Sequence, residues 1–319
     1  MKILVLGGTS FVGRAIVEDA LAGGHDLTLF SRGQTGRDLF PSAERRIGDR
    51  STGDYSSLAE GSWDAVVDVS GYIPRHVGQA ADALGDRVGR YLFISTGSVY
   101  DRLRAPQQMS EDAARLEPER GTEQITDDTY GRLKVACEDD VLARYGQRAT
   151  IVRPGVVAGP HDPTDRFTWW VRRAARGGRV ALPARPDQPV QVVDSGDLAR
   201  LVTRLLANDK PGIYNAVGPA EPTTLAGLIR ACASAAGSDV DVVPVRADGM
   251  QPELPLVLPD DTWDALFRRS AARARAAGMP ATPLTGTAAK VLAWDRQRGE
   301  PPLAIELSPA REAELLAAG

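Results

Sequence analysis

The N-terminal segment joins a short apolar strand directly to a glycine-rich loop and then to a helix. Residues 3–6 (Ile-Leu-Val-Leu) are followed by Gly7-Gly8-Thr9-Ser10-Phe11-Val12-Gly13. Gly7 permits a tight turn after the strand, and Gly13 permits close packing of the helix on the strand. The N-terminus of such a helix presents backbone amides and the positive end of its dipole, which together bind phosphate groups. The segment therefore predicts a dinucleotide-binding loop, in which Ser10 stands where a middle glycine is usual and can donate its hydroxyl to phosphate.

Short apolar runs alternate with helical patterns through the first half of the chain. The expected strands are residues 3–6, 27–30, 65–69, 91–94 and 150–152, and the expected helices between them are residues 11–21, 77–84 and 129–142. Repeated strand-helix-strand units form a parallel sheet covered by helices on both faces. Beyond Pro154 the pattern is irregular, with helices expected at residues 166–176, 196–207, 224–235 and 287–298 and after Ser308.

These patterns predict an α/β fold with two domains. The first is a doubly wound parallel-sheet Rossmann domain over residues 1–155, to which residues 190–215 return. The second is a smaller, mixed α/β C-terminal substrate-binding lobe made mainly of residues 156–319.

Composition excludes several classes of protein. The formal net charge of −4 argues against a nucleic-acid backbone as the main partner. Cys137 and Cys232 lack the spacing of a disulfide framework or a thiolate zinc site, and no metal site is expected. No signal-peptide or membrane-spanning pattern is present. We expect a cytoplasmic protein with a small-molecule substrate and neither a nucleic-acid nor a membrane partner, and a homodimer stays among the alternatives.

Tyr130 and Lys134 are four residues apart in an expected helix, so their side chains lie on one helix face. A phenol has an ordinary pKa near 10, which makes it a poor base unless a nearby positive charge favours its anion. Lys134 can supply that charge. The pair predicts proton transfer in carbonyl and alcohol chemistry.

The end of the second expected strand indicates which cofactor is preferred. Domains that select NAD usually place an acid here, on the ribose hydroxyls, whereas this chain has Ser31 and Arg32. A guanidinium binds a 2′-phosphate in a bidentate fork, so NADP(H) is favoured over NAD(H). Asp49, after the next short strand, has two interpretations: a contact to the adenine amino group or a turn-forming aspartate.

With these features in place, the chain resembles the extended and atypical branch of the short-chain dehydrogenase/reductase superfamily, which is similar to NAD-dependent epimerases and dehydratases. The run Ser95-Thr96-Gly97-Ser98-Val99-Tyr100 matches the family's serine/threonine segment and puts Thr96 at its catalytic hydroxyl position. The family's other conserved elements correspond here to Tyr130, Lys134, Ser70-Gly71 and Arg153-Pro154-Gly155.

Residue patterns and resemblance together predict a complete site. Its expected catalytic residues are Tyr130, Lys134 and Thr96. Its expected cofactor contacts are Gly7, Thr9, Ser10, Phe11, Val12, Gly13, Ser31, Arg32, Asp49, Ser70, Gly71, Lys134 and Pro154. Its expected substrate contacts are Tyr72, Thr96, Ser98 and Tyr130, with Tyr72 included because open α/β sheets bind ligands at the carboxyl ends of their strands.

The resemblance implies hydride transfer between a nicotinamide and a substrate carbon that bears a hydroxyl or ketone. Tyr130 would carry the proton, Thr96 would bind the reacting oxygen, and Lys134 would lower the pKa of Tyr130 and hold the nicotinamide ribose. The predicted function is an NADP(H)-dependent oxidoreductase acting on a hydroxylated, sugar-like or secondary-metabolite substrate. The alternatives are a sugar or nucleotide-sugar epimerase with retained cofactor, and a non-catalytic nucleotide-sensing or RNA-binding protein.

Two departures from the family pattern narrow the chemistry. Dehydratase members follow the catalytic threonine with an Asp-Glu pair, whereas this chain has Gly97-Ser98. Nucleotide-sugar epimerases place an arginine that grips the diphosphate where this chain has Val190. Arg166, Arg172 and Arg185 are the candidates to replace that arginine.

Overall fold

The computed structural model describes residues 1–104, 108–245, 254–303, 305 and 307–318. The chain divides into two compact units, each built from several segments. Unit 1 comprises residues 1–155, 196–216 and 270–280, and unit 2 comprises residues 156–195, 217–269 and 281–319.

Unit 1 is built on a parallel sheet in the order β11-β6-β5-β4-β1-β2-β3. Its strands are β1 (Lys2–Leu6), β2 (Asp26–Ser31), β3 (Glu44–Ile47), β4 (Trp63–Asp68), β5 (Val88–Ile94), β6 (Ala149–Pro154) and β11 (Gly212–Ala216). The chain leaves β1 in one direction and β4 in the other, so the order reverses between these two strands. Ligands of open α/β sheets bind at the carboxyl ends of strands beside such a reversal.

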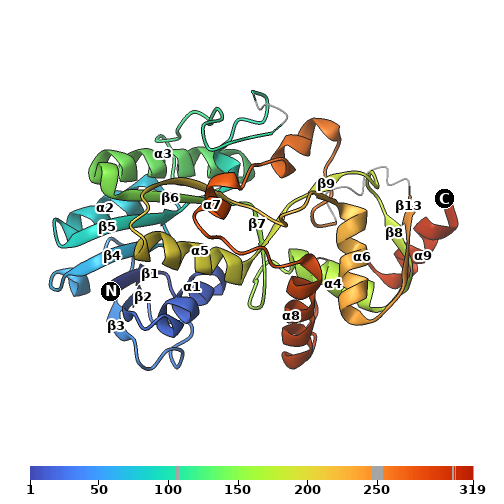
Figure 1. The fold of residues 1–319 in the computed structure, drawn as a ribbon, viewed down its shortest axis with the longest axis horizontal. Coiled ribbons are helices and arrows are strands. Elements are labelled where there is room, and N and C mark those ends of the chain that lie inside the picture. The colour runs from blue at the N-terminus through green and yellow to red at the C-terminus, as the bar shows by residue number, and fades with distance from the viewer. Residues whose placement is uncertain (105–107, 246–253, 304, 306, 319) are drawn as a thin grey trace. The chain divides into compact units, whose positions relative to one another are not determined.

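Helices cover both faces of this sheet, as the repeated strand-helix pattern predicts. Figure 1 shows α2 and α3 on one face and α1 and α5 on the other. The helical elements of this part of the chain are α1 (Phe11–Ala22), η1 (Ser56–Leu58), α2 (Pro74–Leu84), η2 (Gly97–Val99), α3 (Asp127–Tyr145), η3 (Gly146–Arg148), α5 (Ser195–Ala207) and α7 (Ala272–Ala276). Both faces of the central strands are apolar because both are buried: Leu4, Val5, Val66 and Phe93 have no exposed area.

Unit 2 is a mixed α/β lobe with its own core. Its strands are β7 (Val156–Ala158), β8 (Gly178–Leu182), β9 (Pro189–Val190), β10 (Val192–Asp194), β12 (Thr223–Thr224) and β13 (Val240–Pro244). Its helices are α4 (Arg166–Ala175), α6 (Leu225–Ala236), η4 (Asp261–Phe267), α8 (Leu284–Gln297) and α9 (Pro309–Ala318). Trp169 and Trp170 both lie in this core, and the indole of Trp170 donates to the Pro255 carbonyl at 2.8 Å. The predicted α/β class, a doubly wound parallel sheet with a smaller mixed lobe, is confirmed.

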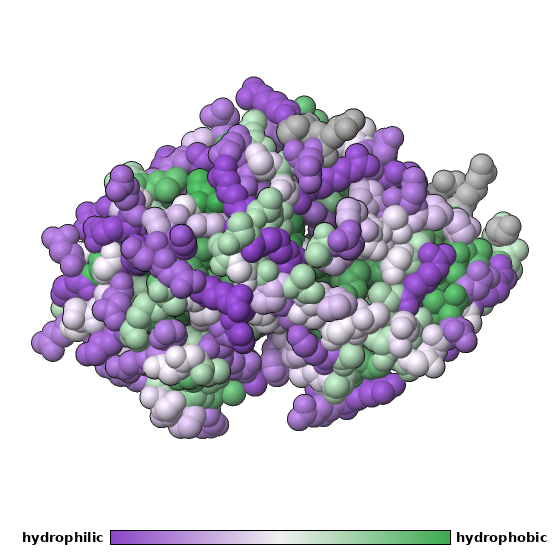
Figure 2. Space-filling model, viewed as in Figure 1, coloured by the Kyte–Doolittle hydropathy of each residue, from purple (hydrophilic) through white to green (hydrophobic). Residues whose placement is uncertain are grey.

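The surface is predominantly hydrophilic in the view of Figure 2. Among the described residues, the large hydrophobic side chains that are exposed are Met1, Ile47, Tyr72, Leu103 and Ile125. No helix in the described ranges is long and apolar enough to cross a membrane.

Candidate active site

The glycine-rich loop follows β1 at the point where the strand order reverses. Gly7 has a φ of +93°, and a Cβ there would lie 2.8 Å from the Cβ of Ser70, so only glycine fits without strain. A Cβ on Gly13 would lie 2.0 Å from the Gly7 carbonyl oxygen, which brings α1 directly onto the loop. Ser10 is the N-cap of α1, yet its side chain makes no capping hydrogen bond. The loop therefore has the conformation that a phosphate-binding turn requires, and the Ser10 hydroxyl is not used to cap the helix.

The segment after β2 lies against this loop. The hydroxyls of Thr9 and Thr35 are 3.2 Å apart, and the Ser31 hydroxyl accepts a hydrogen bond from the Gly33 amide at 3.3 Å. Arg32 is exposed and has no hydrogen bond or ion pair to another described residue. Its guanidinium can therefore bind an anion without first breaking a contact within the protein.

Asp49 forms a turn after β3. Its Oδ1 accepts from the Ser51 amide at 2.9 Å and from the Ser51 hydroxyl at 2.7 Å. These hydrogen bonds, and then the charge of Arg32, lower the pKa of Asp49. Asp49 therefore forms a turn, as one of the two interpretations expects, and its contact with the adenine amino group stays a prediction.

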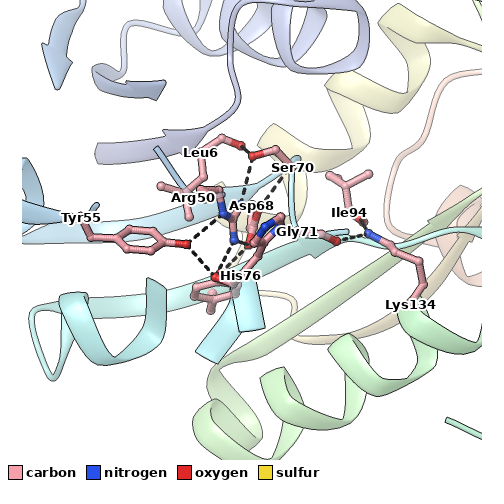
Figure 3. A network of polar contacts seen from close by, with 10 residues as sticks. Leu6, Arg50, Tyr55, Asp68, Ser70, Gly71, His76, Ile94 and Lys134 are labelled. Atoms are coloured by element: carbon pink, nitrogen blue, oxygen red, sulfur yellow. Dashed lines mark hydrogen bonds and ion pairs between the residues drawn. The ribbon is translucent and has the colours of Figure 1, made fainter. Parts of the chain in front are cut away.

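A buried ion pair lies where β4 ends, beside the glycine-rich loop (Figure 3). Arg50 donates to both carboxylate oxygens of Asp68, at 2.5 and 2.8 Å, and Tyr91 donates to the same carboxylate at 2.7 Å. Burial alone would raise the pKa of Asp68, but Arg50 and Tyr91 hold it below its ordinary value. Ser70 joins the network through a hydrogen bond from Arg50 at 3.0 Å, and donates to the Leu6 carbonyl at 3.1 Å. Asp68 and Arg50 are therefore charged in the interior of unit 1.

Lys134 lies on the buried face of α3 and is 2% exposed. Its ammonium donates to the Gly71 and Ile94 carbonyls, each at 2.8 Å, and lies 4.0 Å from the centre of the Phe93 ring. Burial lowers the pKa of Lys134 to about 8. Tyr72, 45% exposed, presents its ring 5.7 Å from the same ammonium. Lys134 is thus held between the carboxyl ends of β4 and β5, beside the sequence-predicted Gly71 and Tyr72.

Thr96 and Tyr130 belong to elements that approach closely. The Thr96 hydroxyl accepts from the Ser98 amide at 3.1 Å and caps η2. A Cβ on Gly131 would lie 2.2 Å from the Ser98 carbonyl oxygen, so this glycine lets the first turns of α3 touch η2. The capping box of Thr126 and Thr129 fixes where α3 begins. Glycine after Tyr130 therefore brings the tyrosine's helix onto the segment that carries Thr96 and Ser98.

We expect Gly131→Ala to separate these two elements. Because the new Cβ would overlap a backbone oxygen, we expect a loss of about 1–3 kcal/mol in the free energy of unfolding, in the range of overpacking substitutions. Chemical denaturation measures this loss. Gly78→Ala is the matched control, since a Cβ on Gly78 in α2 meets nothing within 4 Å and should stabilise by up to about 1 kcal/mol through helix propensity. Equal stability of the two variants would contradict the packing argument.

A second buried ion pair supports the end of β6. Arg153 Nη2 donates to Glu138 at 2.6 Å, and the two side chains are 1% and 0% exposed. Ser95 donates to Glu138 at 2.6 Å, Arg153 donates to the Tyr100 hydroxyl at 2.9 Å, and that hydroxyl donates to Asn215 at 2.6 Å. This network fixes the strand ends that carry Thr96 and Pro154.

The candidate replacements for the diphosphate arginine have partners of their own in unit 2. Arg172 donates to both carboxylate oxygens of Asp295, at 2.7 and 2.8 Å, and Arg185 is paired with Asp264. Arg166 is exposed and donates to the Thr164 hydroxyl at 3.1 Å. Arg166 is therefore the least constrained of the three.

The described residues contain no group of three or more His, Cys, Asp or Glu side chains arranged to hold a metal ion. Arg50, Asp68, Tyr91 and Glu138 are charged or polar groups near the predicted site that are not among the sequence-predicted residues, whereas Arg153 is named there as part of the Arg153-Pro154-Gly155 match. Their only signal was position: Asp68 interrupts an apolar strand, and Arg50 directly follows the predicted Asp49.

Comparison with known proteins agrees with this geometry. The parallel sheet has a glycine-rich, phosphate-binding type of loop where its strand order reverses, and α3 carries a tyrosine and a lysine four residues apart. These features are typical of dinucleotide-binding proteins of the short-chain dehydrogenase/reductase class. The model of the NAD dependent epimerase/dehydratase family matches residues 3–217, and the chain belongs to that family. This family membership supports the predicted class of NAD(P)-dependent enzymes.

Three individual proteins illustrate the likeness. The chloroplast stem-loop binding protein of 41 kDa b from Arabidopsis thaliana is 28% identical over 254 residues, which cover 74% of this chain and 63% of that protein, so the match spans less than two thirds of the relative. A putative epimerase from Burkholderia cenocepacia shares 20% identity and a TM-score of 0.71, over 92% of this chain and 98% of that chain. UDP-glucuronic acid 4-epimerase from Bacillus cereus, in complex with NAD, shares 16% identity and a TM-score of 0.69, over 95% and 99% of the two chains. The two structures show that the fold is shared.

Proposed function

We propose that this enzyme is an NADP(H)-dependent oxidoreductase that interconverts a ketone and an alcohol on a hydroxylated, sugar-like or secondary-metabolite substrate. The observation that carries the proposal is the close approach at Gly131 of α3, which carries Tyr130 and the buried Lys134, to η2, which Thr96 caps and which contains Ser98. When bound, the nicotinamide supplies or accepts the hydride.

The protein's own residues manage the proton and the reacting oxygen. Tyr130 donates a proton to the developing alkoxide in reduction and accepts it from the alcohol in oxidation. Thr96 hydrogen-bonds the same oxygen, and its proximity to Ser98 makes Ser98 a second substrate contact. Lys134 holds the nicotinamide ribose, and Tyr72, exposed beside Lys134, contacts the substrate. Unit 2 keeps its predicted role of a substrate-binding lobe.

The phosphate-binding end of the cofactor fits the residues of the glycine-rich loop. Gly7 and Gly13 permit the tight turn and the close approach of α1, because a Cβ at either position would meet Ser70 or the Gly7 carbonyl. Thr9 and Ser10 precede α1, which begins with Phe11 and Val12. Ser70, Gly71 and Pro154 lie at the carboxyl ends of β4 and β6, where the rest of the cofactor is expected to bind. Arg32, which makes no hydrogen bond or ion pair with another described residue, is assigned to the 2′-phosphate of NADP(H), with Ser31 beside it.

We expect Arg32→Ala to weaken NADPH binding about tenfold, the loss of roughly one charge-assisted contact, while NADH binding stays within twofold. Fluorescence titration of the purified protein with each reduced cofactor measures both affinities. Arg144→Ala is the matched control. Arg144 lies at the C-terminal end of α3, just before the amino end of β6, whereas the cofactor is expected at the carboxyl ends of the strands. Tighter binding of NADH than of NADPH by the unmodified protein would contradict the role given to Arg32.

Epimerisation is the second candidate, favoured by the family match. An epimerase returns the hydride to its substrate and so keeps the nicotinamide bound. Mass spectrometry of the purified protein, together with a spectrophotometric assay of NADPH on a panel of ketones, separates the two. Tightly retained cofactor without net consumption of NADPH favours the epimerase.

RNA binding is the candidate from another class, raised by the stem-loop binding protein at 28% identity. Salt-sensitive RNA binding that persists in Tyr130→Phe, with no turnover of any ketone in the panel, would favour it.

A further inference from the structure

The turn that follows β4 carries one of the two carbonyls that hold Lys134. Gly71 accepts from the Lys134 ammonium at 2.8 Å, and only Val69 and Ser70 separate it from Asp68. Asp68 accepts from the Ser70 amide at 3.1 Å, and a Cβ on Gly71 would lie 3.0 Å from Asp68 Oδ2. The Asp68 carboxylate therefore lies directly against the turn whose carbonyl binds Lys134.

Arg50 fixes this carboxylate and the turn at once. Besides both oxygens of Asp68, it binds the Ser70 hydroxyl and, at 2.9 Å, the His76 carbonyl at the start of α2 (Figure 3). Tyr55 adds a hydrogen bond to the same carbonyl at 3.0 Å. The guanidinium of Arg50 thus anchors both sides of the turn, through Asp68 and Ser70 on the β4 side and through the His76 carbonyl on the α2 side.

A buried ion pair is a weak source of stability, because desolvation of the two charges offsets most of their attraction. A pair of apolar residues would serve equally well if only packing mattered. The Asp68 carboxylate accepts four hydrogen bonds: two from Arg50, one from Tyr91 and one from the Ser70 amide. These bonds instead fix the position of the backbone at Ser70.

We propose that Arg50 and Asp68 are positioning residues, which fix the Ser70-Gly71 turn so that its carbonyl holds the Lys134 ammonium at the cofactor site. The inference rests on the proposed role of Lys134 in holding the nicotinamide ribose. Asp49, the predicted adenine contact, immediately precedes Arg50, so one short segment serves both ends of the cofactor.

A double-mutant cycle on cofactor binding tests this coupling. The four proteins are the unmodified enzyme, Asp68→Asn, Lys134→Met and the double variant, each titrated with NADPH and with NADH. We expect Asp68→Asn to weaken binding about tenfold in the unmodified background and by less than twofold when Lys134→Met is already present. Effects that multiply in the double variant would overturn the proposal.

Loss of a buried charge can also act by destabilising the fold, so a control of similar burial is needed. Glu312→Gln removes the carboxylate that pairs with Arg173 in unit 2, where the two side chains are 8% and 7% exposed. We expect it to lower the unfolding temperature and leave cofactor affinity unchanged. If Asp68→Asn does not fold, Arg50→Lys replaces it in the same cycle, since it keeps the charge and loses the bidentate geometry. An affinity loss for Glu312→Gln equal to that of Asp68→Asn would overturn the proposal.

A second readout needs no cofactor. The chain has four lysines, so selective isotope labelling of lysine gives an NMR spectrum in which the Lys134 side chain is assigned by its loss in Lys134→Met. Charged and titratable groups around Lys134 include Cys137 and Glu138 on α3, Asp68 at the end of β4, Arg50 after β3 and Tyr72 after the Gly71 turn.

We expect the titration midpoint of Lys134 to fall in Asp68→Asn, because the carboxylate favours the ammonium form. An unchanged midpoint and an unchanged Lys134 chemical shift would overturn the positioning role. A shifted midpoint together with a complete lack of cofactor binding by the unmodified protein would overturn the proposed function instead, and leave the positioning role standing.

Discussion

Tyr130→Phe should lower turnover by about 10²–10⁴, the range that a positioned general acid or base contributes. The change removes one hydroxyl and keeps the ring, so the packing of α3 on η2 at Gly131 should persist. Cofactor affinity should stay within twofold, because no cofactor contact is assigned to the phenol. The rate is followed by NADPH absorbance with the best ketone from the panel, and the affinity by fluorescence titration.

Tyr214→Phe provides the matched control for this experiment. The Tyr214 hydroxyl makes only long hydrogen bonds, 3.4 Å to the Lys210 carbonyl and 3.3 Å to the Pro211 carbonyl. Its loss should leave turnover unchanged. Wild-type turnover by Tyr130→Phe would remove the tyrosine from the mechanism and with it the principal argument for carbonyl reduction.

Arg153→Met should lower the free energy of unfolding by about 3–5 kcal/mol, the loss measured when one partner of a buried ion pair is removed. Glu138, a carboxylate with no exposed area, would then have lost its buried partner and would keep only the Ser95 hydroxyl and the partly exposed Arg115 among the described residues. The double variant Arg153→Met with Glu138→Gln should recover much of the loss, because it no longer buries a charge. Urea denaturation gives the three free energies.

Arg115→Ala is the control. It tests whether the loss of stability in Arg153→Met comes from the burial of that ion pair or would follow the loss of any ion pair to Glu138. Arg115 contacts the same carboxylate at 3.1 Å but is 30% exposed, so its loss should cost no more than about 1 kcal/mol. A similar cost for Arg115→Ala and Arg153→Met would show that burial of the Glu138–Arg153 pair is energetically unimportant.

Local patterns were sufficient to predict most of the architecture. Apolar runs predicted β1, β2, β4, β5 and β6, and helical periodicity predicted α1, α3 and α6 within a few residues. β11 was not predicted as a strand, because its five residues include Gly212 and Asn215 and depend on pairing with β6, about 60 positions earlier. Such pairing leaves no local signal.

The predicted site residues lie in unit 1 together, but the groups that hold them could not be predicted from spacing. Arg50, in the segment after β3, and Asp68, at the end of β4, are 18 positions apart, and their contact depends on the tertiary fold. The two carbonyls that accept hydrogen bonds from the buried Lys134 ammonium could not be predicted either. A helical pattern places the lysine on one face of the helix but does not identify its hydrogen-bond acceptors. The roles assigned to these site residues stay predictions.

The interleaving of the two units bears on how the protein is synthesised. Unit 1 needs β11, which leaves the ribosome after residues 156–195 of unit 2, and residues 270–280, which leave it only after most of unit 2. Until then Tyr100 lacks Asn215, and Glu111 lacks both the Asn215 amide and Arg273. Nascent domains commonly fold as units from the N-terminus, but here the edge of the sheet beyond β6 must wait for the later segments. The first 155 residues alone therefore lack the edge strand of the sheet and the partners that Tyr100 and Glu111 find in the later segments.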